Sequence, residues 1–134
     1  MKGSFETIIV DKEGDLAWVT LNRPEVANAF NTRMAEELLE VFSEFVSGAR
    51  KARCIILTGA GERAFCAGGD LKQRHGMTDE EWYQQHVVFE DLARALMDCP
   101  VPILGAINGA AFGGGTELTL ACDFAYAVNH ARFA

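Results

Sequence analysis

The sequence has no C-x-x-C pair, no excess of positive charge and no clean apolar run of membrane-spanning length. Its four cysteines lie far apart and without nearby histidines, so they indicate neither a zinc site nor a disulfide framework. We interpret them as buried free thiols. The chain carries 12 basic and 19 acidic residues, and this net charge of −7 offers no basic surface for nucleic acid.

The chain also shows no sign of secretion or membrane insertion. Its first residues lack the apolar core of a signal peptide and soon include Glu6, which together with the unpaired cysteines favours the reducing cytoplasm. Residues 101–128 are rich in apolar residues, but Pro102, Glu117 and Asp123 interrupt them. A membrane helix needs about 20 mostly apolar residues. We therefore interpret this stretch as a buried strand, a glycine loop and a buried helix.

Length and composition indicate one small globular domain. The chain has 134 residues, and a single domain usually contains about 100 to 200. Apolar patterns at 5–10 and 16–21 around a turn predict an antiparallel hairpin. A helix capped by Asn31 or Thr32 should follow. The glutamates predicted to form its solvated face are Glu36, Glu37, Glu40 and Glu44.

The rest of the chain alternates predicted strands and helices. The apolar run 54–58 predicts a parallel strand that is covered on both faces. Gly59-Ala60-Gly61 lacks the third glycine of a dinucleotide fingerprint, which disfavours a Rossmann site. Thr78 and Glu81 form a capping box for a long helix that ends before Pro100. The remaining predicted elements are a strand at 103–107, a helix from about 115 to 122 and a strand at 124–128. This order predicts an α/β fold with right-handed crossovers.

Two glycine-bearing loops each lie between a predicted strand and a predicted helix. The first is the stretch 65–72, F-C-A-G-G-D-L-K, and the second holds three glycines at 113–115, followed by Glu117. Consecutive glycines let a backbone bring bare N–H groups close to a ligand. A carboxylate in apolar surroundings is costly unless it serves a function. The second loop is therefore predicted to be a catalytic loop that opens a helix.

These loops resemble the A-G-x-D and G-G-G-x-E motifs of the enoyl-CoA hydratase and isomerase family, also called the crotonase family. Four short segments agree in the expected order, so the resemblance covers essentially the whole chain: Asn22-Arg23-Pro24, Asn28-Ala29, Asn108-Gly109 and Cys122-Asp123. The resemblance implies a crotonase-like α/β fold, a spiral of β-β-α repeats. It also implies an acyl-CoA thioester as substrate, with coenzyme A as part of that substrate, no metal and no separate cofactor.

The resemblance assigns three catalytic positions. Hydration of a 2-enoyl thioester places negative charge on the thioester oxygen, which preorganised N–H donors must stabilise. By match to the motifs, the donors are the backbone N–H groups of Gly69 and Gly114, aided by the positive end of the following helix. Glu117 is the implied general base, which contributes about 10²- to 10⁴-fold. The alternative is a glutamate that only favours the helix dipole.

Other residues of the two loops, with one nearby cation, are the implied substrate-binding residues: Ala67, Gly68, Asp70, Leu71, Lys72, Arg63 and Gly113. For Asp70 the alternatives are orienting the first loop and capping the next helix. Arg63 and Lys72 match cations that lie near the CoA phosphates in the family, although single surface cations are more often solvated. The histidines have no partners in the sequence and receive no role.

The chain departs from the family pattern in length. Family members are usually about twice as long, and their hydratases carry a second glutamate at a position that would fall beyond Ala134. We therefore expect residues 1–134 to be the N-terminal part of a crotonase-like domain whose C-terminal half is absent from this chain, with little or no turnover of its own.

The parent protein is expected to be an enoyl-CoA hydratase, a lyase that forms 3-hydroxyacyl-CoA, assembled as a homotrimer or a dimer of trimers. The alternatives are an enoyl-CoA isomerase, another acyl-CoA lyase of the family and a non-catalytic acyl-CoA-binding homologue. RNA binding, as in some relatives, is disfavoured by the net charge.

Overall fold

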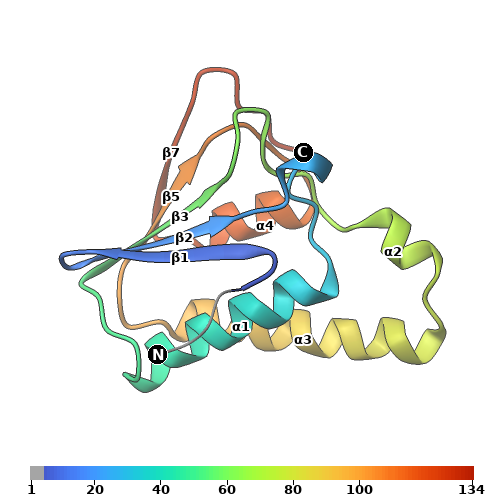
Figure 1. Cartoon of the computed structure of the whole chain (residues 1–134), viewed down its shortest axis with the longest axis horizontal. Coiled ribbons are helices and arrows are strands. Elements are labelled where there is room, and N and C mark those ends of the chain that lie inside the picture. Colours follow the sequence, from blue (N-terminus) through green and yellow to red (C-terminus); the bar gives the residue numbers. More distant parts are fainter. Residues whose placement is uncertain (1–4) are drawn as a thin grey trace.

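A five-stranded sheet and a two-stranded sheet form the frame of the protein in the computed structural model, which describes residues 5–134 (Figure 1). The larger sheet has the order β1 (Ile8–Glu13), β2 (Leu16–Leu21), β3 (Cys54–Gly59), β5 (Ile103–Ile107) and β7 (Phe124–Ala127). Strands β1 and β2 are antiparallel, and the other neighbouring strands are parallel. The smaller sheet pairs β4 (Ala64–Cys66) with β6 (Ala110–Ala111) in parallel.

The helices complete a repeating pattern. They are α1 (Thr32–Ser47), α2 (Leu71–His75), α3 (Asp79–Asp98) and α4 (Gly114–Ala121), with a 3-10 turn, η1 (Pro24–Val26). Figure 1 shows α1 and α3 side by side on the same side of the larger sheet. From β3 onward the chain twice forms a strand of the larger sheet, a strand of the smaller sheet and then helix: β3–β4 with α2 and α3, and β5–β6 with α4. The predicted spiral of β-β-α repeats is confirmed.

Local sequence signals place the starts of both long helices. The Asn31 side chain accepts a hydrogen bond from the Met34 N–H at 2.9 Å and caps α1. Thr78 and Glu81 form the predicted capping box of α3. The first strand begins at Ile8, later than predicted, because the N–H groups of the two preceding residues donate to a side chain of α1 instead of to a strand.

The apolar face of α1 forms the centre of the core. It buries Met34, Leu38, Phe42 and Phe45 completely or nearly so. Burial of such a side chain contributes about 1.5–3 kcal/mol. The same cluster includes Leu92 and Leu96 of α3 and alternate residues of the larger sheet. Packing of α1 and α3 against the sheet therefore fixes the position of α3, which later forms one wall of a pocket.

The face of α1 predicted to be solvated contains one buried glutamate. Glu37 is only 4% exposed, and its carboxylate accepts hydrogen bonds from the Thr7 hydroxyl at 2.6 Å and from the Thr7 and Glu6 N–H groups at 2.8 Å each. Arg33, one turn earlier, donates to the same carboxylate at 3.2 Å. The prediction was wrong for Glu37 because buried backbone N–H groups before β1 need an acceptor, and Glu37 provides it.

Glu37 should make stability depend on pH. Burial by itself raises the pKa of Glu37, but hydrogen bonds from Thr7 and Glu6 and the charge of Arg33 outweigh it and lower the pKa below its ordinary value of 4.5. Such a carboxylate stabilises the fold above its unfolded-state pKa, and this contribution is lost as the pH falls through the folded-state pKa. We expect Glu37→Gln to lower the free energy of unfolding by about 1–3 kcal/mol at pH 7 and by less in acid.

Urea unfolding followed by circular dichroism at both pH values measures this difference. Glu36→Gln is the matched control, because Glu36 is an exposed neighbour on α1. Equal stability of Glu37→Gln and the unchanged protein at pH 7 would contradict the assignment.

Residues 101–128 form β5, α4 and β7 as predicted, together with the short strand β6, which was not predicted, and the end of this stretch is not buried. All four residues of β7 are exposed, and Leu120 on α4 is 78% exposed. Strand β7 is the outermost strand of the sheet, and nothing within residues 5–134 covers it. Strand β3 likewise alternates buried with half-buried residues, so only one of its faces is fully covered. No helix within the described part of the chain is both long and apolar enough to cross a membrane.

The cysteines are free thiols, but only Cys66 is buried. Cys54, Cys99 and Cys122 are half-buried, which corrects the expectation that all four are inside. Burial raises the pKa of the Cys66 thiol to about 11. Burial, together with the nearby charge of Asp123, raises that of Cys122 to about 11 as well. Both remain protonated near neutral pH and are poor nucleophiles.

Candidate active site

The two glycine loops meet because β4 and β6 pair in parallel and both loops leave from the same end. The Phe112 N–H donates to the Cys66 carbonyl oxygen at 3.0 Å. A Cβ atom at Gly115 would collide with that same carbonyl oxygen. Gly68 has a φ of +97°, and a Cβ there would lie 2.8 Å from the Phe112 carbonyl oxygen. Glycine at 68 and 115 is therefore what allows the loops to touch.

Two backbone N–H groups at this junction have no acceptor within residues 5–134: those of Gly69 and Gly114. Other amides near Gly69 do have acceptors. The Phe30 N–H donates to the Gly68 carbonyl oxygen at 2.7 Å, and the Asp70 N–H donates to the Phe30 carbonyl oxygen at 3.0 Å. Gly114 begins α4, where N–H groups lack intrahelical acceptors. A Cβ at either glycine would meet nothing within 4 Å, so both amides border open space.

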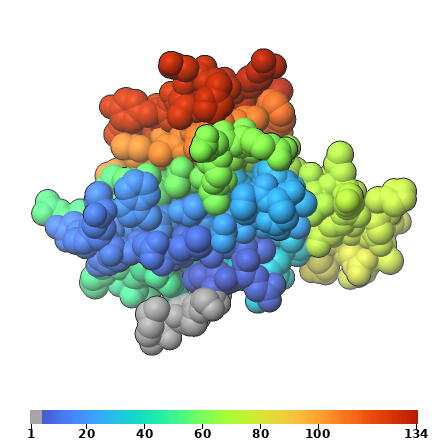
Figure 2. Space-filling view, turned by 45° about the horizontal axis from the view of Figure 1, so that its top comes forward, coloured from blue at the N-terminus to red at the C-terminus, as the bar shows by residue number. Residues whose placement is uncertain are grey.

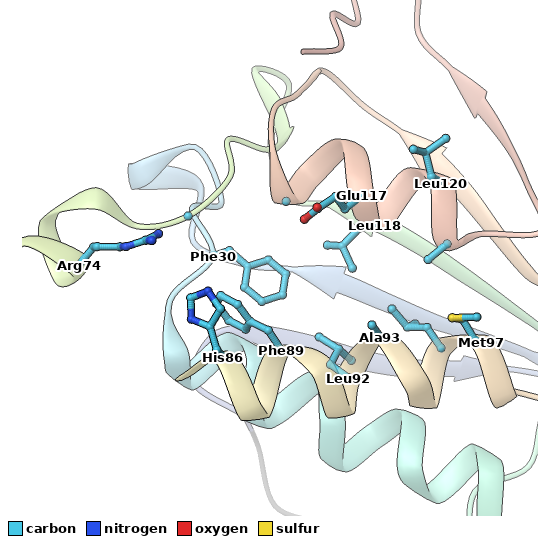
Figure 3. A pocket seen from close by; sticks show the side chains of 14 residues that line it. Phe30, Arg74, His86, Phe89, Leu92, Ala93, Met97, Glu117, Leu118 and Leu120 are labelled. Atoms are coloured by element: carbon cyan, nitrogen blue, oxygen red, sulfur yellow. The ribbon is translucent and has the colours of Figure 1, made fainter. Parts of the chain in front are cut away.

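The open space is a pocket of about 700 Å³ between α3 and α4 (Figure 3). That volume lies within the range of about 300–1,000 Å³ that is usual for small-molecule sites. Gly69 and Gly114 both line it. Its lining is mostly apolar and includes Phe30, Phe89, Leu92, Leu96, Met97 and Leu118.

Glu117 lies on the first turn of α4 and lines the same pocket (Figure 3). Its carboxylate makes no hydrogen bond or ion pair with other described residues, and the residue is exposed. The expectation of a buried carboxylate was wrong, because the apolar residues around it in sequence do not surround it in space. Leu118 faces the core at 6% exposure, whereas Leu120 faces outward. The Glu117 carboxylate is thus available to a ligand.

Asp70 is held by the protein itself. Its carboxylate accepts from the Gln73 N–H at 3.1 Å, capping α2, and from Arg23 Nη1 at 3.0 Å. Burial by itself raises the pKa of Asp70, but these hydrogen bonds and the charge of Arg23 lower it. Arg23 also donates to the Ala29 carbonyl at 2.8 Å. This supports the capping and orienting interpretation, and contact of Asp70 with substrate stays a prediction.

Two asparagines hold the backbone that leads into the first loop. Asn28 is fully buried, accepts from the Arg23 N–H at 2.8 Å and donates to the Ala64 carbonyl at 3.0 Å. Asn108 accepts from the Gly59 N–H at 3.0 Å and donates to the same Ala64 carbonyl at 3.1 Å. Both asparagines belong to the short segments on which the family resemblance rests, but their hydrogen-bond partners are visible only in the structure.

The other predicted substrate-binding residues do not line the pocket. Arg63 and Lys72 are exposed, and Leu71 is 76% exposed. Ala67, Gly68 and Gly113 belong to the loop backbones behind the two unpaired amides, and the Gly113 N–H donates to the Ala134 carbonyl at 2.8 Å. Substrate contacts for all of them stay predictions.

Sequence reasoning missed two polar residues of the pocket, Arg74 and His86. Arg74 lies over the Trp82 ring, with its guanidinium carbon 5.6 Å from the ring centroid. The His86 ring packs on Trp82 at a centroid distance of 3.9 Å. The only signal in the sequence was the spacing of Trp82 and His86, which places both on one face of a helix. That spacing does not show whether this face of the helix lines a pocket.

Known proteins of one family are similar to this chain. Residues 11–134 match the family model described as enoyl-CoA hydratase/isomerase. The chain is 42% identical over 120 residues to YngF of Bacillus subtilis, covering 90% of this chain and 46% of that protein. It is 36% identical over 129 residues to the short-chain-enoyl-CoA hydratase of Clostridium acetobutylicum, covering 96% and 49%.

Solved structures give the same result. The crystal structure of an enoyl-CoA hydratase from Bacillus anthracis matches with a TM-score of 0.89 at 40% identity, covering 96% of this chain and 50% of that one. The chain thus spans about half the length of these relatives. Since the family model matches nearly the whole chain, the chain belongs to the enoyl-CoA hydratase/isomerase family.

Proposed function

We propose that the complete protein containing this chain adds water to a 2-enoyl-CoA thioester and forms a 3-hydroxyacyl-CoA. The observation that carries the proposal is the convergence of two unpaired N–H groups, those of Gly69 and Gly114, with the free Glu117 carboxylate in one pocket. Relatives named as enoyl-CoA hydratases support it. The proposal includes no metal and no cofactor other than the substrate's own CoA, and a trimeric or hexameric assembly in the cytoplasm.

Each group has a separate role in the proposed reaction. The thioester oxygen accepts hydrogen bonds from Gly69 and Gly114 as it gains negative charge, and loss of one such donor typically costs about 2.7–4 kcal/mol. The positive end of α4 stabilises the same charge. Glu117 takes a proton from water while the water oxygen bonds to C3. The proton that C2 then gains comes from the second glutamate that the family resemblance places beyond Ala134.

Product analysis of the complete protein tests the proposal. With crotonyl-CoA we expect 3-hydroxybutyryl-CoA, detected by mass spectrometry as the addition of one water. Conversion of 3-butenoyl-CoA to crotonyl-CoA without hydration would instead identify an isomerase. Binding without turnover of either compound would identify a non-catalytic acyl-CoA-binding homologue.

Binding can be tested on residues 1–134 directly. We expect acetoacetyl-CoA to bind more tightly than free CoA in a calorimetric titration, because only the ester offers a thioester oxygen to the two amides. Equal affinity for both would contradict recognition of the thioester by these loops. Little or no turnover is expected from this chain alone, since it carries one of the two catalytic carboxylates that the family resemblance implies.

A further inference from the structure

The unpaired N–H of Gly69 belongs to a peptide unit between two glycines, in the loop that joins β4 to α2. Gly68 has a φ of +97°, and a Cβ at Gly69 would meet nothing within 4 Å. A glycine backbone rotates more freely than that of any other residue. Rotation of this peptide unit would turn its carbonyl oxygen toward the pocket and its N–H away from it. The proposed oxyanion site therefore needs contacts that prevent the rotation.

The Phe30 backbone contacts both peptide units around Gly69. Its N–H donates to the Gly68 carbonyl oxygen at 2.7 Å, and its carbonyl oxygen accepts from the Asp70 N–H at 3.0 Å. The carbonyl and the N–H of a trans peptide unit point in opposite directions. Because the Gly68 carbonyl points at the Phe30 N–H, the Gly69 N–H points away from it and stays free for the pocket that Gly69 lines.

The second donor, the Gly114 N–H, is held in a different way. The Gly113 carbonyl oxygen belongs to the same peptide unit and accepts from the Glu117 N–H at 3.0 Å. Gly113 is the N-cap of α4, so this is a hydrogen bond of the helix itself. The orientation of the Gly114 N–H thus follows from α4, whereas that of the Gly69 N–H depends on contacts between segments distant in sequence.

Arg23 joins the two segments that pair at Phe30 and Gly69. Its Nη1 donates to the Ala29 carbonyl oxygen at 2.8 Å and to Asp70 Oδ2 at 3.0 Å. Ala29 is the residue before Phe30. Asp70 is the residue after Gly69. One guanidinium nitrogen therefore bridges both segments beside the point where they pair. The side chains of Arg23 and Asp70 are only 18% and 15% exposed, so salt screens this ion pair little.

Both partners of the ion pair extend from a backbone that is itself held. The Arg23 N–H donates to Asn28 Oδ1 at 2.8 Å, and Asn28 is fully buried. Asp70 Oδ1 accepts from the Gln73 N–H at 3.1 Å and caps α2, which leaves Oδ2 for Arg23. Figure 2 shows that the yellow-green segment carrying α2 projects from one end of the molecule. The ion pair thus ties the start of a projecting segment to the rest of the protein.

We propose that Arg23 is a positioning residue of the reaction, which acts through Ala29 and Asp70 to keep the Gly69 N–H turned toward the thioester oxygen. This inference rests on the proposed hydratase function. Arg23 does not line the pocket, so its effect on the substrate passes through the backbone. Without the guanidinium, the two glycines rotate more easily. A displaced donor reduces stabilisation of the transition state and leaves the contacts to the CoA part of the substrate in place.

Substitutions at both partners of the ion pair test the proposal in the complete protein. Arg23→Met removes the bridge, and Asp70→Asn removes the ion pair but keeps an acceptor that can cap α2. We expect each to lower kcat for crotonyl-CoA about 10- to 100-fold and to change the affinity for free CoA less than about twofold. The double variant should lose no more than the more damaging single variant, because both changes break one contact. Arg23→Lys, which keeps the charge, should recover part of the loss.

The carbonyl stretch of a bound thioester reports on the Gly69 donor without turnover. Butanoyl-CoA, isotopically labelled at the thioester carbonyl carbon, has no double bond to hydrate. Hydrogen bonds to its thioester oxygen lower the stretching frequency in difference infrared spectra. We expect a smaller shift in Arg23→Met and Asp70→Asn than in the unchanged protein. Arg50→Met is the matched control, because Arg50 forms a half-buried ion pair with Glu44 outside the pocket, and it should change neither kcat nor the shift.

Three results would each overturn the role of Arg23. They are an equal carbonyl shift in the unchanged protein and both variants, losses of kcat that multiply in the double variant, and a loss of affinity for free CoA as large as the loss of kcat. If Arg23→Met does not fold, the carbonyl shift in Asp70→Asn and Arg23→Lys decides the question. If the unchanged protein does not hydrate crotonyl-CoA, the hydratase assignment fails, and the carbonyl shift still decides whether Arg23 positions the Gly69 N–H.

Discussion

Replacement of Glu117 by glutamine is expected to slow hydration of crotonyl-CoA by about 10²- to 10⁴-fold in the complete protein, the contribution of a positioned general base. The glutamine has nearly the same size and cannot take a proton from water. Because Glu117 is exposed and makes no hydrogen bond or ion pair with the described residues, Glu117→Gln should fold normally. Acetoacetyl-CoA should bind with nearly unchanged affinity, since the two N–H donors remain.

Steady-state kinetics and calorimetry on one preparation measure both quantities. Glu90→Gln is the matched control, because Glu90 is an exposed glutamate of α3 outside the pocket, and it should change neither value. Full activity of Glu117→Gln would remove Glu117 from the reaction. An equal loss of turnover and binding would point to a structural role instead.

The second large effect is expected at Gly114. A side chain there projects into open space at the pocket, so Gly114→Val should preserve the fold and obstruct the approach of the thioester to the amide. We expect hydration to fall by about 10²-fold or more, as when an oxyanion donor is removed. The affinity for acetoacetyl-CoA should fall as well, and this separates Gly114→Val from Glu117→Gln.

The neighbouring glycine provides the contrast. At Gly115 a Cβ would collide with the Cys66 carbonyl, a backbone atom that cannot move aside cheaply. Gly115→Ala should therefore destabilise the fold by about 1–3 kcal/mol, the usual cost of overpacking. Thermal unfolding of both variants measures this difference. If Gly114→Val unfolded at a lower temperature than Gly115→Ala, the assigned geometry would be contradicted. Full hydration activity of Gly114→Val would contradict it as well.

Much of the fold could be predicted because its signals are local. The cap at Asn31, the capping box at Thr78 and the alternation of Leu16–Leu21 act within a few residues, and all three are confirmed. The motif match likewise identified the family, which the family model confirms. It also singled out Gly69, Gly114 and Glu117, the three predicted residues that line the pocket.

Exposure could not be predicted from local patterns. Glu37 has the spacing of a surface glutamate, yet it is buried because backbone N–H groups thirty residues earlier in the chain need its carboxylate. Glu117 stands in an apolar run, yet it is exposed because its neighbours on α4 point elsewhere. Both errors arise because a side chain's surroundings depend on segments distant in sequence.

The sequence by itself determined the order of the larger sheet's strands and of the long helices, the two glycine loops and the family, because these depend on residue type and short spacing. The short strands β4 and β6 were not predicted. Only the tertiary structure brought Arg74 and His86 into one pocket with Glu117, because α2, α3 and α4 come together through packing and not through adjacency in the chain. It also left the amides of Gly69 and Gly114 without acceptors, since the parallel pairing of β4 with β6 decides where the two loops meet.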